Sequence, residues 1–247
     1  MSRTASVIFF LPGAQEATSL STLIERLVRT TNGNPLGKWG LEHRILRSTA
    51  SNLADDKTHP PRLHHILHLL NWPQLTHIVI SGGPPSPNGN ADPTQALETI
   101  IAIPYAQQAS YIQLLKLKMG ALWTPRTVLQ VANGSAYEAG EITIRLGDLR
   151  QLVGPGAHHG VVCFLQMQFE VPGEGEDGLG GGAMEVSVSP EAVAMAEQSA
   201  KDALTEFWQN SGVGGTARET WRFSGPGEAE NGLGEAGLWC DVLRLRK

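Results

Sequence analysis

The sequence predicts an α+β protein: an antiparallel β-barrel-like sheet with about three flanking helices. About nine short runs of apolar or alternating residues have the length of β-strands. Three longer segments have the apolar spacing of amphipathic helices. The helices are dispersed along the chain and do not follow every strand, which disfavours a doubly wound parallel sheet. A curved antiparallel sheet or barrel with helices packed outside it is therefore the expected architecture.

Apolar or β-branched runs predict strands through the first half of the chain. These runs are short, and turn-forming residues such as Pro12-Gly13 end them. One segment fits two structures: its leucine and isoleucine spacing suits a helix, whereas its eight-residue length and the Asn71-Trp72-Pro73 that follows suit a buried strand. The predicted strands are Ser6–Leu11, Lys38–Arg47, Thr76–Ser81 and Glu98–Ile103, and the ambiguous segment is Leu63–Leu70.

The second half contains a predicted antiparallel meander. Thr127–Ala132 ends in Asn133-Gly134, a dipeptide typical of two-residue hairpin turns. Glu141–Leu146 and Gly160–Val171 alternate apolar and polar residues, so each strand should have one buried face and one wetter face. We expect Gly147 to mark a bulge or a bend.

Three segments have helical spacing. Ser19–Arg29 carries its leucines, isoleucine and valine on one side, and Ala106–Leu122 repeats apolar residues at intervals of three and four. Ser189-Pro190-Glu191 is typical of an N-cap, a first-turn proline and an acidic first turn, and it predicts a helix to about Trp208. The short apolar run Leu238–Leu245 predicts a final strand.

Composition excludes several classes of protein. The formal net charge of the 247 residues is −5, which disfavours a broad electrostatic nucleic-acid binder. Two cysteines cannot build a dense disulfide framework, and no apolar run approaches the ~20 residues of a membrane helix. We expect one domain over residues 1–247, with flexible glycine-rich inserts near 82–93, 172–183 and 224–237.

The motifs that could carry chemistry are weak. Residues 173–178 match the dinucleotide pattern G-x-G-x-x-G, but their acidic side chains would repel a pyrophosphate and no helix pattern follows. His64, His65 and His68 could hold a metal on a helix, but on a strand His64 and His68 would lie ~13 Å apart. Cys163 falls on an apolar strand face, as a small core residue does. We therefore predict no catalytic residues, no metal and no cofactor.

Two longer strings resemble a known family. They are PLGKWGLEHRILRS at residues 35–48 and ALWTPRTVLQVANGSAYEAGEITIRLGDLRQ at residues 121–151. With THIVISG at 76–82 and the strand that begins at Gly160, these strings resemble fungal subunit 20 of Mediator, the RNA polymerase II coactivator. The resemblance spans roughly residues 5–171 and continues more weakly through the helix near 190–209.

This resemblance implies a β-barrel-like fold and a non-catalytic role in the Mediator head module, in the nucleus. It implies pairing with Mediator subunit 18, attachment through a C-terminal segment of subunit 8, and contact with the RNA polymerase II machinery through the complex. It also favours a strand for Leu63–Leu70. We expect Trp39, Trp123 and Arg126 to contact the partner, because they lie in the family-like strings and because Trp and Arg are enriched at interface hot spots. Core packing explains the two tryptophans equally well.

An alternative function is a barrel that binds a small ligand or a phosphate in its lumen, with or without enzymatic activity. The alternating strands distinguish the two functions. A lumen filled by Val161, Leu165, Met167 and Phe169 would leave no room for a charged substrate. A lumen lined by Glu141, Arg145, Gln166 and Glu170 would favour the ligand-binding alternative.

Overall fold

A computed structural model describes residues 2–13, 19–49, 62–81, 99–152, 157–172, 189–212, 217–229 and 231–244. The strands are β1 (Ser2–Pro12), β2 (Asn34–Ser48), β3 (Leu63–Leu69), β4 (Leu75–Ser81), β5 (Thr99–Pro104), β6 (Trp123–Ala139), β7 (Ile142–Gln151), β8 (His158–Glu170) and β9 (Arg218–Ser224). The helices are α1 (Leu20–Thr31), the 3-10 turn η4 (Tyr105–Gln107), α2 (Gln108–Lys118), α3 (Pro190–Asn210), α4 (Pro226–Ala229) and α5 (Leu233–Leu243).

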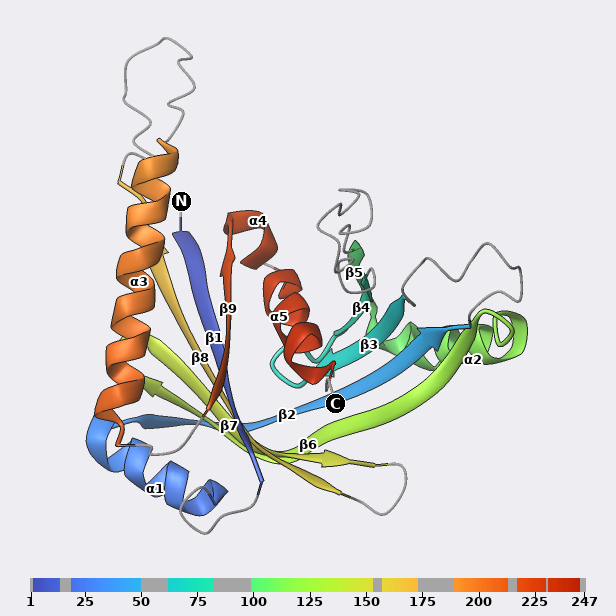
Figure 1. The fold of residues 1–247 in the computed structure, drawn as a ribbon, viewed down its shortest axis with the longest axis horizontal. Coiled ribbons are helices and arrows are strands. Elements are labelled where there is room, and N and C mark those ends of the chain that lie inside the picture. The colour runs from blue at the N-terminus through green and yellow to red at the C-terminus, as the bar shows by residue number, and fades with distance from the viewer. Residues whose placement is uncertain are drawn as a thin grey trace, which may run out of the picture.

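All nine strands belong to one antiparallel sheet, in the order β5-β4-β3-β2-β6-β7-β8-β1-β9. The sheet curls into a half-barrel (Figure 1). Its curvature coincides with register shifts in β2, β6 and β8, and such bulges bend the strands that carry them. The predicted α+β class with a curved antiparallel sheet is confirmed.

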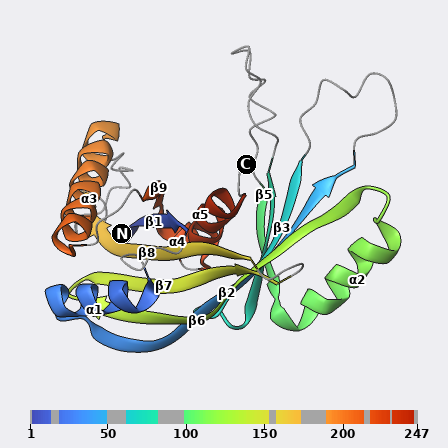
Figure 2. The ribbon, with the colours of Figure 1, turned by 60° about the horizontal axis from the view of Figure 1, so that its bottom comes forward.

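Helices cover both faces of the sheet (Figures 1 and 2). The outer, convex face carries α1 and α3 at one end, where Leu23, Leu27 and Leu204 pack on the strands. The inner, concave face holds α5, whose Leu238 and Trp239 join the largest core cluster. Within the described residues, no helix is both long enough and apolar enough to span a lipid bilayer.

Most predicted elements lie where the sequence placed them. Ser19 and Ser189 cap α1 and α3, since each side-chain oxygen accepts a hydrogen bond from a backbone N–H of the first turn. Leu63–Leu69 is a strand, which resolves the ambiguity of that segment. The predicted inserts at 82–93 and 173–183 lie outside the described residues.

Three predictions about the C-terminal half of the chain are wrong. Asn133-Gly134 forms no hairpin turn: β6 runs through it with a register shift, and the turn falls at Gly140, whose φ is +60°. The run Leu238–Leu243 belongs to α5, because a short segment that is apolar all round can be buried as a helix inside the half-barrel. The expected insert at 224–237 contains α4 and the start of α5. The strand β9 has no counterpart in the prediction.

Glycines make room for Trp39 at the centre of the inner face. A Cβ on Gly134 would lie 2.6 Å from Trp39 Cε3, and a Cβ on Gly147 would overlap Val131 Cγ1. Gly147 lies inside the register shift between β6 and β7, where residues 131–134 face residues 147–149, so an irregularity occurs at the predicted place. Its pairing with β8 continues without a shift, and the glycine also permits the close packing of Val131 and Trp39.

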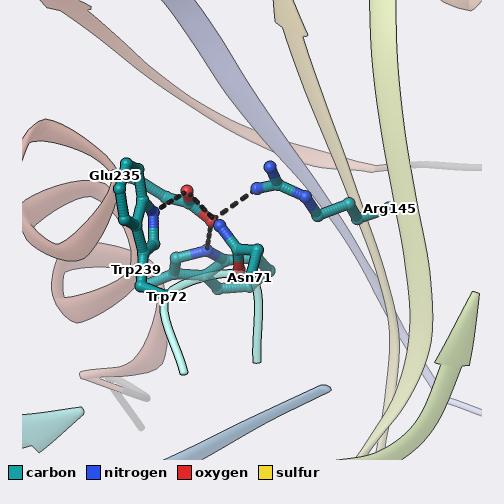
Figure 3. Close-up of polar contacts among 5 residues, drawn as sticks. All are labelled: Asn71, Trp72, Arg145, Glu235 and Trp239. Atoms are coloured by element: carbon teal, nitrogen blue, oxygen red, sulfur yellow. Dashed lines mark hydrogen bonds and ion pairs between the residues drawn. The ribbon is translucent and has the colours of Figure 1, made fainter. Parts of the chain in front are cut away.

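One buried carboxylate fixes α5 inside the sheet (Figure 3). Glu235 accepts hydrogen bonds from Asn71 Nδ2 at 2.9 Å, Trp72 Nε1 at 3.3 Å, Arg145 Nη1 at 2.7 Å and Trp239 Nε1 at 3.2 Å. Arg145 is also its ion-pair partner, and both side chains are largely buried. The turn after β3, the strand β7 and α5 itself therefore meet at a single charged group.

We expect Gly147→Ala to lower the free energy of unfolding by about 1–3 kcal/mol, because the added methyl group overpacks the contact with Val131 and Trp39. Urea unfolding followed by tryptophan fluorescence measures this change. Gly227→Ala is the control, since Gly227 is exposed and has open space around its Cα. Equal stability of the two variants would contradict the packing role of Gly147.

We expect Glu235→Ala to destabilise the protein by about 3–5 kcal/mol, because it leaves the Arg145 charge buried without its partner. Glu25→Ala breaks an exposed pair with Arg29 on α1 and should change stability by less than about 0.5 kcal/mol. Urea titrations of the two variants provide the comparison. A loss at Glu235 no larger than the loss at Glu25 would show that the buried carboxylate does not anchor α5.

Candidate partner-binding surface

The helix α2 covers the outer face of the sheet at the end opposite α1 and α3 (Figure 2). It follows β5 through η4, and its Leu115 packs against Leu46, Ile66 and Ile78. Trp123, at the start of β6, packs on the edge of the same cluster. The cluster is small, so only a narrow face of α2, centred on Leu115, packs against the sheet.

The opposite side of α2 exposes leucines among polar residues such as Ser110 and Gln113. Leu117 is 77% exposed and Leu114 is 48% exposed, and Leu122 just beyond the helix is 58% exposed. An exposed helix of a folded domain normally turns polar residues toward water. Leu114 and Leu117 lie three residues apart on one helix face, so they form an exposed apolar patch next to Leu122.

A groove lies between α2 and the strands β2 and β6. Its volume is about 210 Å³, and we call it the α2 groove. Apolar side chains such as Leu46, Ile112 and Leu115 line it. The lining also includes three basic residues: Arg44, Lys116 and Arg126. An apolar partner segment with acidic residues would match this combination.

Two of the three residues expected to contact a partner lie at this surface. Trp123 is half-buried beside α2, and Arg126 is exposed and lines the α2 groove. Trp39 lies elsewhere: it is 2% exposed and stacks on Trp239 of α5, with ring centroids 5.4 Å apart. Trp39 therefore serves the core, and partner contact remains a proposal for Trp123 and Arg126.

A buried polar contact supports α2 from below. The hydroxyl of Tyr111 on α2 lies 2.9 Å from His64 Nε2 on β3, and the His64 ring meets Trp123 edge-on at 4.9 Å. Burial lowers the pKa of His64 to about 4 and raises the pKa of Tyr111. His64 is therefore uncharged at neutral pH. Its ring lies between the sheet and α2 and contacts Tyr111 of that helix.

The lumen of the half-barrel has a polar end. A cavity of about 850 Å³ is lined there by Glu138, Glu141, Gln166, Gln168 and Glu170, among others. Val161 and Leu165 are buried in the outer cluster with α1 and α3, whereas Met167 and Phe169 pack against that cluster and also line this cavity, so the apolar set does not fill the lumen. Arg145 points inward but is engaged by Glu235. The described lining contains glutamates and no lysine or arginine, which opposes phosphate binding.

The three histidines considered as a metal site do not face one another. Along β3, His64 and His68 contact Tyr111 and Tyr105, whereas His65 points to the inner face and meets His43. Cys163 is buried in the outer cluster, and burial raises the pKa of its thiol. Sequence spacing could not reveal the neighbours of His65, because they come from β2 and α5.

Comparisons with known proteins give one strong match. The family model for the TATA-binding related factor (TRF) of subunit 20 of Mediator complex matches residues 1–221. No curated protein matches the sequence significantly.

Two solved structures show weak likenesses. The PH1819 protein of Pyrococcus horikoshii OT3 has a TM-score of 0.39 and 11% identity, over 83% of this chain and 89% of that chain. HpAC1 from Hippeastrum, a protein with a dominant triphosphatase activity, has a TM-score of 0.37 and 9% identity, over 96% of each chain. Likenesses of this size transfer no activity to the present chain.

The lowered pKa of His64 predicts that stability falls in mild acid. Its ordinary pKa of 6.5 holds in the unfolded chain, so between pH 6.5 and about 4 the unfolded state binds a proton that the folded state excludes. The free energy of unfolding should therefore decrease as pH falls through this window, by at most about 1.4 kcal/mol per pH unit for this group. Urea unfolding of the wild type and of His64→Phe at pH 7, 6 and 5 measures the slope. If the free energy of unfolding depends on pH equally in the two proteins, the lowered pKa of His64 is contradicted.

Proposed function

This chain belongs to the Mediator subunit 20 family, and on that basis we propose that it is a non-catalytic subunit of the Mediator head module that pairs with subunit 18. Family membership makes it a component of the Mediator complex, which serves transcription by RNA polymerase II. The family match over residues 1–221 is the observation that carries the proposal. The nucleus is the proposed compartment, since transcription takes place there.

The exposed leucines of α2 support pairing with another subunit. Leu114, Leu117 and Leu122 leave apolar surface in water on the same part of the fold, and burial of each against a partner would contribute up to about 1.5–3 kcal/mol. A stable pair should bury more than ~1,000 Å². We infer that subunit 18 covers this surface together with the adjoining α2 groove.

The charges around the α2 groove suggest how the pair is oriented. Arg44, Lys116 and Arg126 line the groove, and Arg44 is held by Glu42 at 2.6 Å. Lys116 and Arg126 are both exposed, so they can face carboxylates of a partner. Such rim charges mainly set the rate and the orientation of association, while the leucines contribute most of the affinity.

A C-terminal segment of Mediator subunit 8 is the proposed link between the pair and the rest of the head. The family resemblance suggests this partner. In this proposal the chain bridges regulators and polymerase as part of an assembly, and it catalyses no reaction.

We expect the wild-type chain, co-expressed with subunit 18 of the same organism, to form a one-to-one complex that survives high salt. A doubly substituted chain, Leu114→Glu with Leu117→Glu, should bind at least about tenfold more weakly, because two apolar contacts are replaced by buried charges. Light scattering gives the stoichiometry, and calorimetry gives the affinity.

Met195→Glu is the matched control, because Met195 is 75% exposed on α3, away from α2. This variant should bind like the wild type. Arg126→Glu should slow association and alter its salt dependence with little effect on folding. Equal binding by the α2 variant and the control would refute the proposed surface. A monodisperse wild-type chain that forms no complex with subunit 18 would refute the proposed pairing.

A further inference from the structure

Three buried side chains with metal-binding atoms converge between the sheet and α5. His43 comes from β2, His65 from the neighbouring strand β3, and Cys240 from the middle of α5. Each side chain offers one ligand atom, and the three atoms lie within 4.8 Å of one another. All three residues are fully buried. The sequence separates them by as much as 197 positions, so the fold alone brings them together.

The two imidazole rings face each other through one nitrogen each, beside the Cys240 sulfur. His43 Nε2 lies 2.9 Å from His65 Nδ1, and Cys240 Sγ lies 3.9 Å from His43 Nε2. The ring planes are within 6° of each other, with centroids 5.1 Å apart. This alignment places the facing nitrogens almost on the line between the rings, next to the sulfur.

The second shell around His65 matches that of a ligand. Its other ring nitrogen, Nε2, lies 3.4 Å from the hydroxyl of Ser81 on β4. When His65 Nε2 carries the proton and donates a hydrogen bond to Ser81 Oγ, the lone pair of His65 Nδ1 faces His43 and Cys240. Metal-bound histidines commonly have their second nitrogen held in this way. His43 Nδ1, in contrast, is buried with no hydrogen-bond partner among the described residues.

We propose that His43, His65 and Cys240 form a binding site for a thiophilic divalent metal ion of the zinc type. Two imidazole nitrogens and one sulfur are the ligands that Zn²⁺ prefers in proteins. The thiol proton leaves to solvent when the Zn–S bond forms, so the sulfur binds as thiolate and no redox change takes place.

Metal binding requires the three ligand atoms to move. Zn–N bonds of about 2.0–2.1 Å and a Zn–S bond of about 2.3 Å give tetrahedral edges of roughly 3.3 Å between nitrogens and roughly 3.6 Å between nitrogen and sulfur. The separations of 2.9 and 3.9 Å differ from these by less than about half an ångström, and His65 Nδ1 and Cys240 Sγ, within 4.8 Å of each other, must approach by at most roughly 1.2 Å. The two rings must also turn, because their facing nitrogens point at each other and have to converge on one ion.

The charges near the site have opposing effects on a bound cation. Arg244, at the end of α5, disfavours positive charge at His65, and its ion pair with Asp241 at 3.0 Å offsets part of that effect. The Cys240 thiolate adds a negative charge when the metal is bound. The ion would link α5 to β2 and β3 directly, so its role is structural: it holds the helix against the inner face alongside the Glu235 contacts.

The test uses the full chain after treatment with a chelator and dialysis. We expect calorimetry to show one equivalent of Zn²⁺ bound, and thermal unfolding to shift upward by several degrees when Zn²⁺ is in excess. Co²⁺ serves as a spectroscopic probe, because cobalt bound to a thiolate gives an intense near-ultraviolet charge-transfer band. Cys240→Ala should weaken Zn²⁺ binding at least 100-fold and abolish this band.

Cys163→Ala is the matched control, since it removes the other buried cysteine from the outer cluster. It should keep the cobalt band and the shift in unfolding temperature. If Cys240→Ala fails to fold, the cobalt spectrum of the wild type still decides the question without a variant. A wild type with no thiolate–cobalt band and no stabilisation by Zn²⁺ overturns the proposal. A Zn²⁺ affinity that is the same in Cys240→Ala and in the wild type also overturns the proposal. In either case the cluster is a hydrogen-bonded histidine pair next to a thiol that binds no metal.

Discussion

The ion pair between Glu235 and Arg145 governs what can occupy the inside of the curled sheet. A buried carboxylate is tolerated only when its charge and its hydrogen-bonding capacity are met. Glu235 satisfies this condition by gathering donors from β7, from the turn after β3 and from its own helix. These contacts give α5, most of whose residues are apolar and buried, one orientation on the concave face. The helix α5 then covers the inner core around Trp39 and Trp239.

The helix α5 fills much of the half-barrel, so the proposed partner surface lies on its outside. The remaining cavity at the polar end of the lumen is lined by glutamates, whereas the exposed apolar groups of α2 lie on the opposite, outer face. Exposed leucines on the outer face suit the protein contacts proposed for this subunit. The membership of the chain in a Mediator family agrees with this arrangement.

The strand β3 connects the interior with the proposed partner surface. Successive side chains of a strand point to opposite faces, so His64 lies beneath α2 while His65 lies beside Cys240. Both histidines are buried, and burial lowers the pKa of each below its ordinary value.

The sequence by itself determined the elements whose signals are local. Alternation identified the meander of β7 and β8, apolar spacing marked α1, the capping Ser189 marked α3, and the LWTPR-type string with its neighbours pointed to the family. Tertiary structure decided what depends on neighbours from elsewhere in the chain. Asn133-Gly134 became part of β6 because Trp39 packs there, and Leu238–Leu243 became helical because the half-barrel buries it on all sides. The convergence of His43, His65 and Cys240 has no signal in the spacing, since strand pairing and the docking of α5 create it.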